Sequence, residues 1–72
     1  MNTNNLVLQS IDEALADYAA NPSNGYFLGR VSGLLSAALL GYLISEKEHD
    51  ALTKRSVEIG CANYHQLEQI AA

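Results

Sequence analysis

The chain has little of the chemistry that stabilises many small proteins. Its 72 residues include a single cysteine, Cys61, so no disulfide can form within the chain. It has two histidines, one proline and no tryptophan. A structural zinc ion takes about four Cys, His or carboxylate ligands, and we therefore expect no metal and no cofactor. A domain of this size buries only about 60% of the surface that its unfolded chain exposes. Self-association is the expected supplement.

Positive charge is also scarce. Four Lys and Arg stand against eight Asp and Glu, which gives a formal net charge of −4. The phosphate backbone of a nucleic acid repels such a chain, so we expect no direct nucleic-acid partner. Residues 1–5 lack the basic segment and apolar run of a secretion signal. We expect residues 1–4 to be disordered and the protein to be cytoplasmic.

What the chain does contain is a helical pattern throughout, which predicts an all-α fold and one domain over residues 1–72. Apolar residues at helical spacing predict a first helix over 5–20, capped by Asn4 or Asn5; they are Leu8, Ile11, Leu15 and Tyr18. The turn formers at 21–25 end it. A second helix over 25–41 is apolar on nearly every side and must be covered by other protein.

Ser45 and Glu48 have the spacing of a capping box and predict that a third helix begins at residue 46. The surrounding run 41–48 resembles the turn of short helical-hairpin domains appended to many bacterial proteins. Gly60 leaves two alternatives for the third helix, a break followed by a fourth helix over 62–72 or one helix over 46–70. We favour the long helix, because one internal glycine costs only about 1 kcal/mol relative to alanine.

These elements predict a small three-helix bundle in which the helix over 25–41 lies between the other two. That helix has more apolar surface than two short neighbours cover, so we also expect a homodimer with the second helix central. Gly41 is the residue expected to end the second helix, in the left-handed conformation.

A ladder of small residues recurs every fourth position in the second helix and predicts a groove where another helix packs closely; its members are Gly29, Gly33, Ala37 and Gly41. The same pattern occurs in transmembrane dimers, and residues 26–44 are about long enough to span a bilayer. Arg30 and two serines interrupt this span, which favours a helix buried in protein.

Two small groups could carry function. Tyr26, Phe27 and Arg30 lie near the start of the second helix and form a possible partner surface, since aromatic residues and arginine are enriched at interfaces. The alternative is that Tyr26 packs on the first helix. Cys61 and His65 are four residues apart and could face one metal ion, but a buried cysteine beside a surface histidine is the simpler interpretation. No third residue completes a catalytic set with them.

The function expected from this pattern is that of a small non-enzymatic interaction protein, a regulator or accessory factor that occupies a surface of another protein. Its size suggests an origin in a mobile genetic element. One alternative is a small membrane-associated subunit anchored by residues 26–44. Another is a dimer linked by a metal ion through Cys61 and His65.

Overall fold

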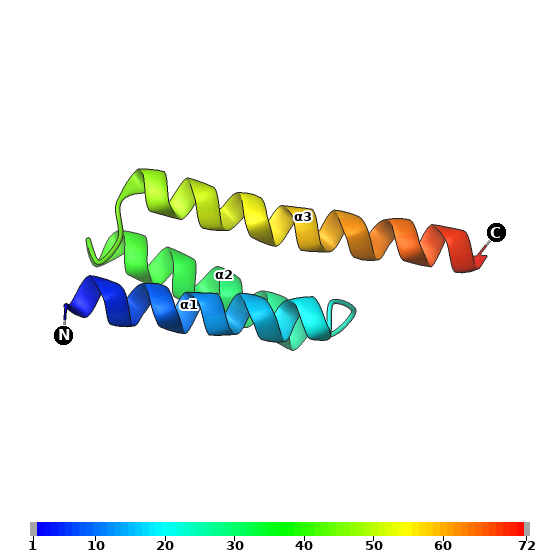
Figure 1. The fold of residues 1–72 in the computed structure, drawn as a ribbon, viewed down its shortest axis with the longest axis horizontal. Helices are drawn as coiled ribbons and strands as arrows, with labels where there is room; N and C mark the ends of the chain where they lie inside the picture. Colours follow the sequence, from blue (N-terminus) through cyan, green and yellow to red (C-terminus); the bar gives the residue numbers. More distant parts are fainter. Residues whose placement is uncertain (1, 72) are drawn as a thin grey trace.

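Three helices account for most of the chain. The computed structural model describes residues 2–71, which form α1 (Thr3–Ala20), α2 (Gly25–Leu40) and α3 (Glu46–Ala71). Helix α2 runs antiparallel to both α1 and α3 (Figure 1). The molecule is elongated, about 47 × 18 × 16 Å, and the two ends of the chain lie at opposite ends of its long axis (Figure 1). The predicted all-α three-helix bundle is confirmed.

The core lies mainly between α1 and α2. Eight apolar side chains are buried; they are Ile11, Ala14, Leu15, Tyr18, Val31, Leu35, Ala38 and Ile44. Four come from α1 and three from α2, and Ile44 comes from the turn that follows. No side chain of α3 is buried within the part of the helix that the structure describes. The α1–α2 hairpin is therefore the platform on which α3 packs.

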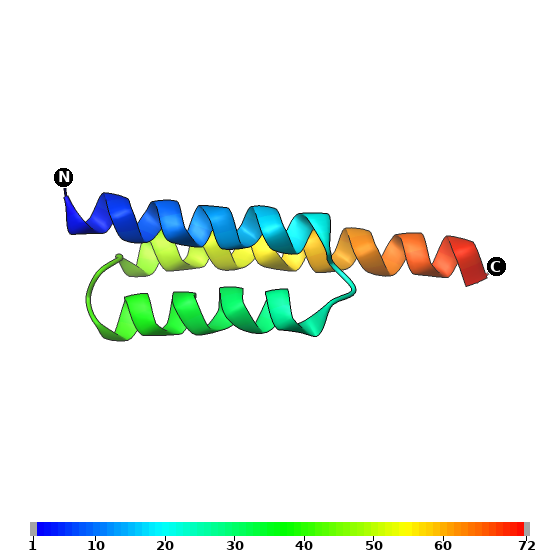
Figure 2. The same ribbon diagram turned by 90° about the horizontal axis from the view of Figure 1, so that it is seen from below.

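Helix α3 packs along both helices of this hairpin, roughly aligned with them (Figure 2). Leu52 and Ile59 are half-buried and pack against the core. Each pair of helices is in contact, so the expected arrangement with the second helix between the other two is wrong. Much of α2 faces outward because α1 and α3 cover only one side of it; the predicted covering on every side is not present in a single chain.

An asparagine side chain caps the start of each of the first two helices, α1 and α2. The side chain of Asn2 accepts a hydrogen bond from the Asn4 amide, so α1 begins at Thr3 rather than at residue 5. Residues 2–4, expected to be disordered, form this cap and the first helical turn; Met1 lies outside the described residues. The predicted turn over 21–25 is present, and Asn24 caps α2 by accepting from the Tyr26 amide.

The turn between α2 and α3 differs from the prediction at one residue. Gly41 has φ −84° and is not left-handed, whereas Tyr42 has φ 57°. The amide of Leu43 donates to the Ala38 carbonyl at 2.9 Å, and the Tyr42 amide donates to the Leu39 carbonyl at 3.1 Å. These two bonds are a Schellman motif with tyrosine in the position that usually holds glycine. Helix α2 consequently ends at Leu40, one residue before the predicted end.

Helix α3 begins and continues as predicted. The Glu48 amide donates to Ser45 Oγ at 3.0 Å, and the Ser45 amide donates to Glu48 Oε1 at 2.9 Å. This reciprocal pair confirms the capping box. The helix runs without a break through Gly60 to Ala71. Its 26 residues make it about 39 Å long, against about 27 Å for the 18 residues of α1, so its last turns extend past the hairpin (Figure 2).

Candidate interaction surfaces

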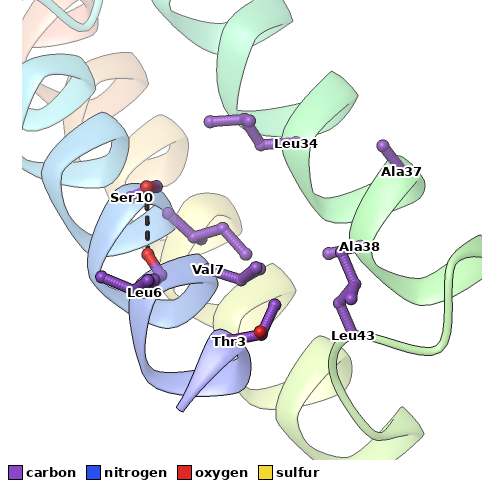
Figure 3. A pocket seen from close by; sticks show the side chains of 9 residues that line it. Thr3, Leu6, Val7, Ser10, Leu34, Ala37, Ala38 and Leu43 are labelled. Atoms are coloured by element: carbon purple, nitrogen blue, oxygen red, sulfur yellow. Dashed lines mark hydrogen bonds between the residues drawn. The ribbon is translucent and has the colours of Figure 1, made fainter. Parts of the chain in front are cut away.

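An apolar groove opens between α1 and α2 near the start of the chain. It has a volume of about 270 Å³. Leu6 and Val7 line it from α1, and Leu34 and Ala37 line it from α2, so side chains of the two helices face each other across it (Figure 3). Leu43, from the turn after α2, also contributes. We call this the α1–α2 groove.

A polar network supports the α1–α2 groove from the side of the turn. The side-chain amide of Asn4 donates to the Leu43 carbonyl at 2.7 Å and lies 3.4 Å from Glu48 Oε1. The pKa of Glu48 is lowered, first by the hydrogen bond from the Ser45 amide and then by those from the Asn4 and Ser45 side chains. These bonds tie the beginning of α1 to the beginning of α3, and they hold Leu43 in place beside the groove.

The small-residue ladder lies on the exposed side of α2. Gly29, Gly33, Ala37 and Gly41 are all exposed. Apart from the adjacent residues and the local helix backbone, no atom of the described chain lies within 4 Å of a Cβ built on Gly29 or Gly33. The ladder therefore makes no helix packing inside a single chain, and its role against another chain stays a prediction. Ala37 alone of the four lines the α1–α2 groove.

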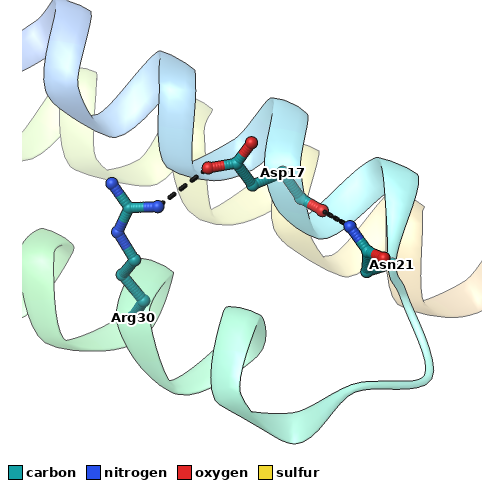
Figure 4. A network of polar contacts seen from close by, with 3 residues as sticks. All are labelled: Asp17, Asn21 and Arg30. Carbon is teal, nitrogen blue, oxygen red and sulfur yellow. Dashed lines mark hydrogen bonds and ion pairs between the residues drawn. The ribbon is translucent and has the colours of Figure 1, made fainter.

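The predicted partner surface is divided by the fold. Tyr26 is exposed and does not pack on α1, whereas Phe27 is half-buried against the core. Their rings meet edge to face, with centroids 5.3 Å apart and an interplanar angle of 81°. The Arg30 side chain extends toward α1, where its guanidinium lies 2.8 Å from the Asp17 carboxylate (Figure 4). Of the three, only Tyr26 presents a largely exposed aromatic ring.

Asp17 also helps to end α1. Its backbone carbonyl accepts hydrogen bonds from the amide and the side chain of Asn21, both at 3.1 Å (Figure 4). The same residue thus holds α2 through its carboxylate and closes the last turn of α1 through its carbonyl. A second ion pair joins Arg55 of α3 to Asp12 of α1. Both pairs are partly exposed, which limits each to about 0.2–1 kcal/mol.

The turn after α2 forms an apolar tip. Leu40 and Tyr42 are 80% and 95% exposed. Tyr42 also has an unfavourable backbone conformation for a residue with a side chain. This tip was not predicted from the sequence, because Gly41 and not Tyr42 was the residue expected in the left-handed conformation.

The remaining candidates, Cys61 and His65, both lie on α3. Cys61 is exposed, so the expected buried cysteine is wrong. His65 lies 3.9 Å from Glu68, its neighbour one turn further along α3. Within the described residues there is no group of three or more His, Cys, Asp or Glu side chains placed to hold a metal ion.

Residues 26–44 do not form the single helix required of an anchor, because α2 ends at Leu40. Among the described residues no helix combines the length and the apolar character needed to cross a bilayer. Comparisons of the chain with protein-family models, curated proteins and solved structures find no match.

The α1–α2 groove was not predicted from the sequence. The signal was present in Leu6 and Val7, which add apolar side chains beside the core positions of α1. When the apolar stripe of a helix is wider than the area that one neighbouring helix covers, a row of apolar side chains remains at the edge of the contact. The groove arises where this extra row meets Leu34 and Ala37 of α2.

Proposed function

We propose that this protein is a non-enzymatic interaction protein that binds another protein through the α1–α2 groove. The observation that carries the proposal is the groove itself, an opening of about 270 Å³ whose lining is almost entirely apolar and comes from both helices and the following turn. Apolar side chains on a concave surface favour burial of a partner's apolar side chains. Occupying a partner's surface changes what else the partner binds, which is how a small regulator or accessory factor acts.

The shape of the groove favours a helical partner. It lies between two antiparallel helices, and Ala37 lets another chain approach α2 closely at this point. An amphipathic helix places large apolar side chains on one face at intervals of three and four residues, which is the pattern that fits such a groove. The acidic residue Glu13 lies one helical turn after Ser10, which lines the groove on α1, so basic residues beside the partner's apolar face would add electrostatic attraction.

The test uses two arginine substitutions on α2. Ala37→Arg places a long charged side chain in the groove, whereas Gly29→Arg places the same side chain in open space on the outer face of the same helix. Each purified variant is used to capture proteins from a lysate of the source organism, and the captured proteins are compared by mass spectrometry. We expect a specific partner to be retained by the wild type and Gly29→Arg and lost by Ala37→Arg.

Circular dichroism and thermal unfolding establish that both variants keep the helical fold. A partner that Ala37→Arg retains as well as the wild type does would contradict binding through the groove. Loss of the partner only in Gly29→Arg would assign binding to the outer face of α2 instead.

A further inference from the structure

The last two turns of α3 carry apolar side chains that no other part of the described chain covers. The Ser23 hydroxyl lies 3.3 Å from Asn63 Oδ1, which marks the level at which the α1–α2 hairpin ends. Beyond it, Tyr64, Leu67 and Ile70 are exposed, and Ile70 is 82% exposed. Successive steps of three residues place them within an arc of roughly 120° on the helix. We call residues 64–71 the free end of α3.

A groove of similar length lies on the same helix. It opens between α2 and α3 with a volume of about 350 Å³, and its lining includes Leu28, Leu35, Thr53, Ser56 and Val57. Along α3 it extends from residue 49 to residue 57, which is about 12 Å. The free end, from residue 64 to residue 71, is slightly shorter, about 10 Å. We call this opening the α2–α3 groove.

We propose that two copies of this chain form an antiparallel dimer in which the free end of each copy lies in the α2–α3 groove of the other. A two-fold axis crosses α3 near residues 61–63. Leu67 of one copy then meets Val57 of the second, and Tyr64 lies at the level of Gly60. Both contacts occur twice, as an interface between identical surfaces requires.

The charges on α3 select this orientation. In the antiparallel arrangement Lys54 lies opposite Glu68 of the second copy, and Glu58 lies opposite His65. A parallel arrangement places Lys54 against Lys54 and Glu68 against Glu68, and like charges across an interface oppose association. Lys54 makes no ion pair within residues 2–71 of its own chain, so its ammonium group is available to a second copy.

The proposal differs from the expected dimer in the surface it uses. The expectation placed the small-residue ladder of α2 at the centre of the contact. In the structure the ladder face of α2 carries small side chains between Tyr26 and Leu40. The large exposed apolar side chains of α3 are Val57, Tyr64, Leu67 and Ile70. The dimer surface also lies apart from the α1–α2 groove, so the two binding events are independent.

The first test compares two exposed apolar positions by sedimentation equilibrium. Ile70→Glu places a charge on the free end, and Leu40→Glu places the same charge on the tip of the α2–α3 turn; the two side chains are 82% and 80% exposed. We expect the wild type to dimerise, Ile70→Glu to raise the dissociation constant about a hundredfold or more, and Leu40→Glu to leave it unchanged. A wild type that is monomeric at all concentrations overturns the proposal and leaves partner binding by the α1–α2 groove standing.

The second test exchanges the charges. Lys54→Glu and Glu68→Lys are each expected to weaken the dimer several-fold, because each brings like charges together. The double variant restores opposite charges at both contacts and is expected to recover most of the loss. A double variant no stronger than the weaker single variant contradicts the antiparallel pairing.

The third test measures orientation by disulfide formation with diamide, which oxidises two thiols to one disulfide. Cys61 lies near the proposed axis, so wild type is expected to form a covalent dimer. In a Cys61→Ser background, Lys54→Cys mixed with Glu68→Cys is expected to cross-link, and neither variant is expected to cross-link alone. Cross-linking of Lys54→Cys with itself indicates a parallel dimer and overturns the proposal.

Discussion

The hydroxyl of Tyr18 lies over Gly60, 3.1 Å from the position that a Cβ atom on Gly60 would occupy. Tyr18 is a buried residue of α1, and Gly60 is in the middle of α3. The glycine that weakened the prediction of a continuous third helix is therefore at a point of close approach between two helices. Glycine permits this contact because it has no side chain.

Gly60→Ala is expected to gain less stability than alanine normally gives in a helix. The usual gain is about 1 kcal/mol, but the new methyl group displaces the Tyr18 hydroxyl. In a Tyr18→Phe background the hydroxyl is absent, and Gly60→Ala is expected to give the full gain. Urea unfolding of the four proteins in this double-mutant cycle measures the difference. Equal effects of Gly60→Ala in the two backgrounds would show that the contact has no energetic consequence.

Tyr42→Gly is expected to stabilise the protein by about 1 kcal/mol, because a residue with a side chain pays a conformational cost at positive φ and glycine does not. Tyr42 is 95% exposed, so little packing is lost. Tyr42→Asn should lie between the two, since asparagine tolerates this conformation. The matched control is Tyr26→Gly, an exposed tyrosine within α2, which is expected to destabilise by about 0.5–1 kcal/mol. Thermal unfolding distinguishes these outcomes.

The capping box gives the protein a specific sensitivity to acid. The pKa of Glu48 is lowered from the ordinary value of 4.5 in the folded state, so its contribution to stability is fully present above pH 4.5 and is lost as the pH falls through the folded-state pKa. The stability advantage of wild type over Glu48→Gln is expected to shrink across that range. Urea unfolding at a series of pH values measures it, and an advantage that does not change with pH would disprove the assignment.

An NMR titration of Glu48 provides the control for this effect. In Asn4→Ala the hydrogen bond from the Asn4 side chain is absent while the bond from the Ser45 amide is kept. The pKa of Glu48 should then rise part of the way toward 4.5. No change in this variant would exclude Asn4 as a contributor.

Arg30→Met is expected to cost little, about 0.2–1 kcal/mol, because the ion pair with Asp17 is partly exposed. The loss should diminish with added salt, which screens exposed charges. Asp17→Asn gives the matched removal of the other charge, and the double variant should cost no more than either single change. Chemical unfolding at low and high ionic strength tests this, and strictly additive losses would contradict a direct interaction.

The sequence predicted the three helices well because each has a clear local signal. The apolar spacing of Ile11, Leu15 and Tyr18 defines the buried side of α1, and these residues are in the core. The pair Ser45 and Glu48 fixes the first residue of α3 through hydrogen bonds that need no distant partner. Features decided within one turn of helix can be inferred from the sequence.

The remaining features depend on how the helices align, which local patterns do not determine. The expectation that Gly41 is left-handed was wrong. The amides of Tyr42 and Leu43 donate to carbonyls near the end of α2, and this pattern puts the left-handed conformation at Tyr42, one residue after Gly41. The free end of α3 is visible only when the contact between Ser23 and Asn63 shows where the hairpin stops. The α1–α2 groove likewise requires the relative positions of Val7 and Leu34.

The two ends of the chain lie at opposite ends of the long axis of the molecule, which is about 47 Å long, and this determines how the protein should be attached to a sensor surface. An attachment beside Asn2 crowds the α1–α2 groove and leaves the opposite end of the rod in solution. An attachment after α3 crowds the free end and leaves the groove accessible. Immobilising the protein in both orientations therefore separates binding to a foreign partner from binding to its own copies.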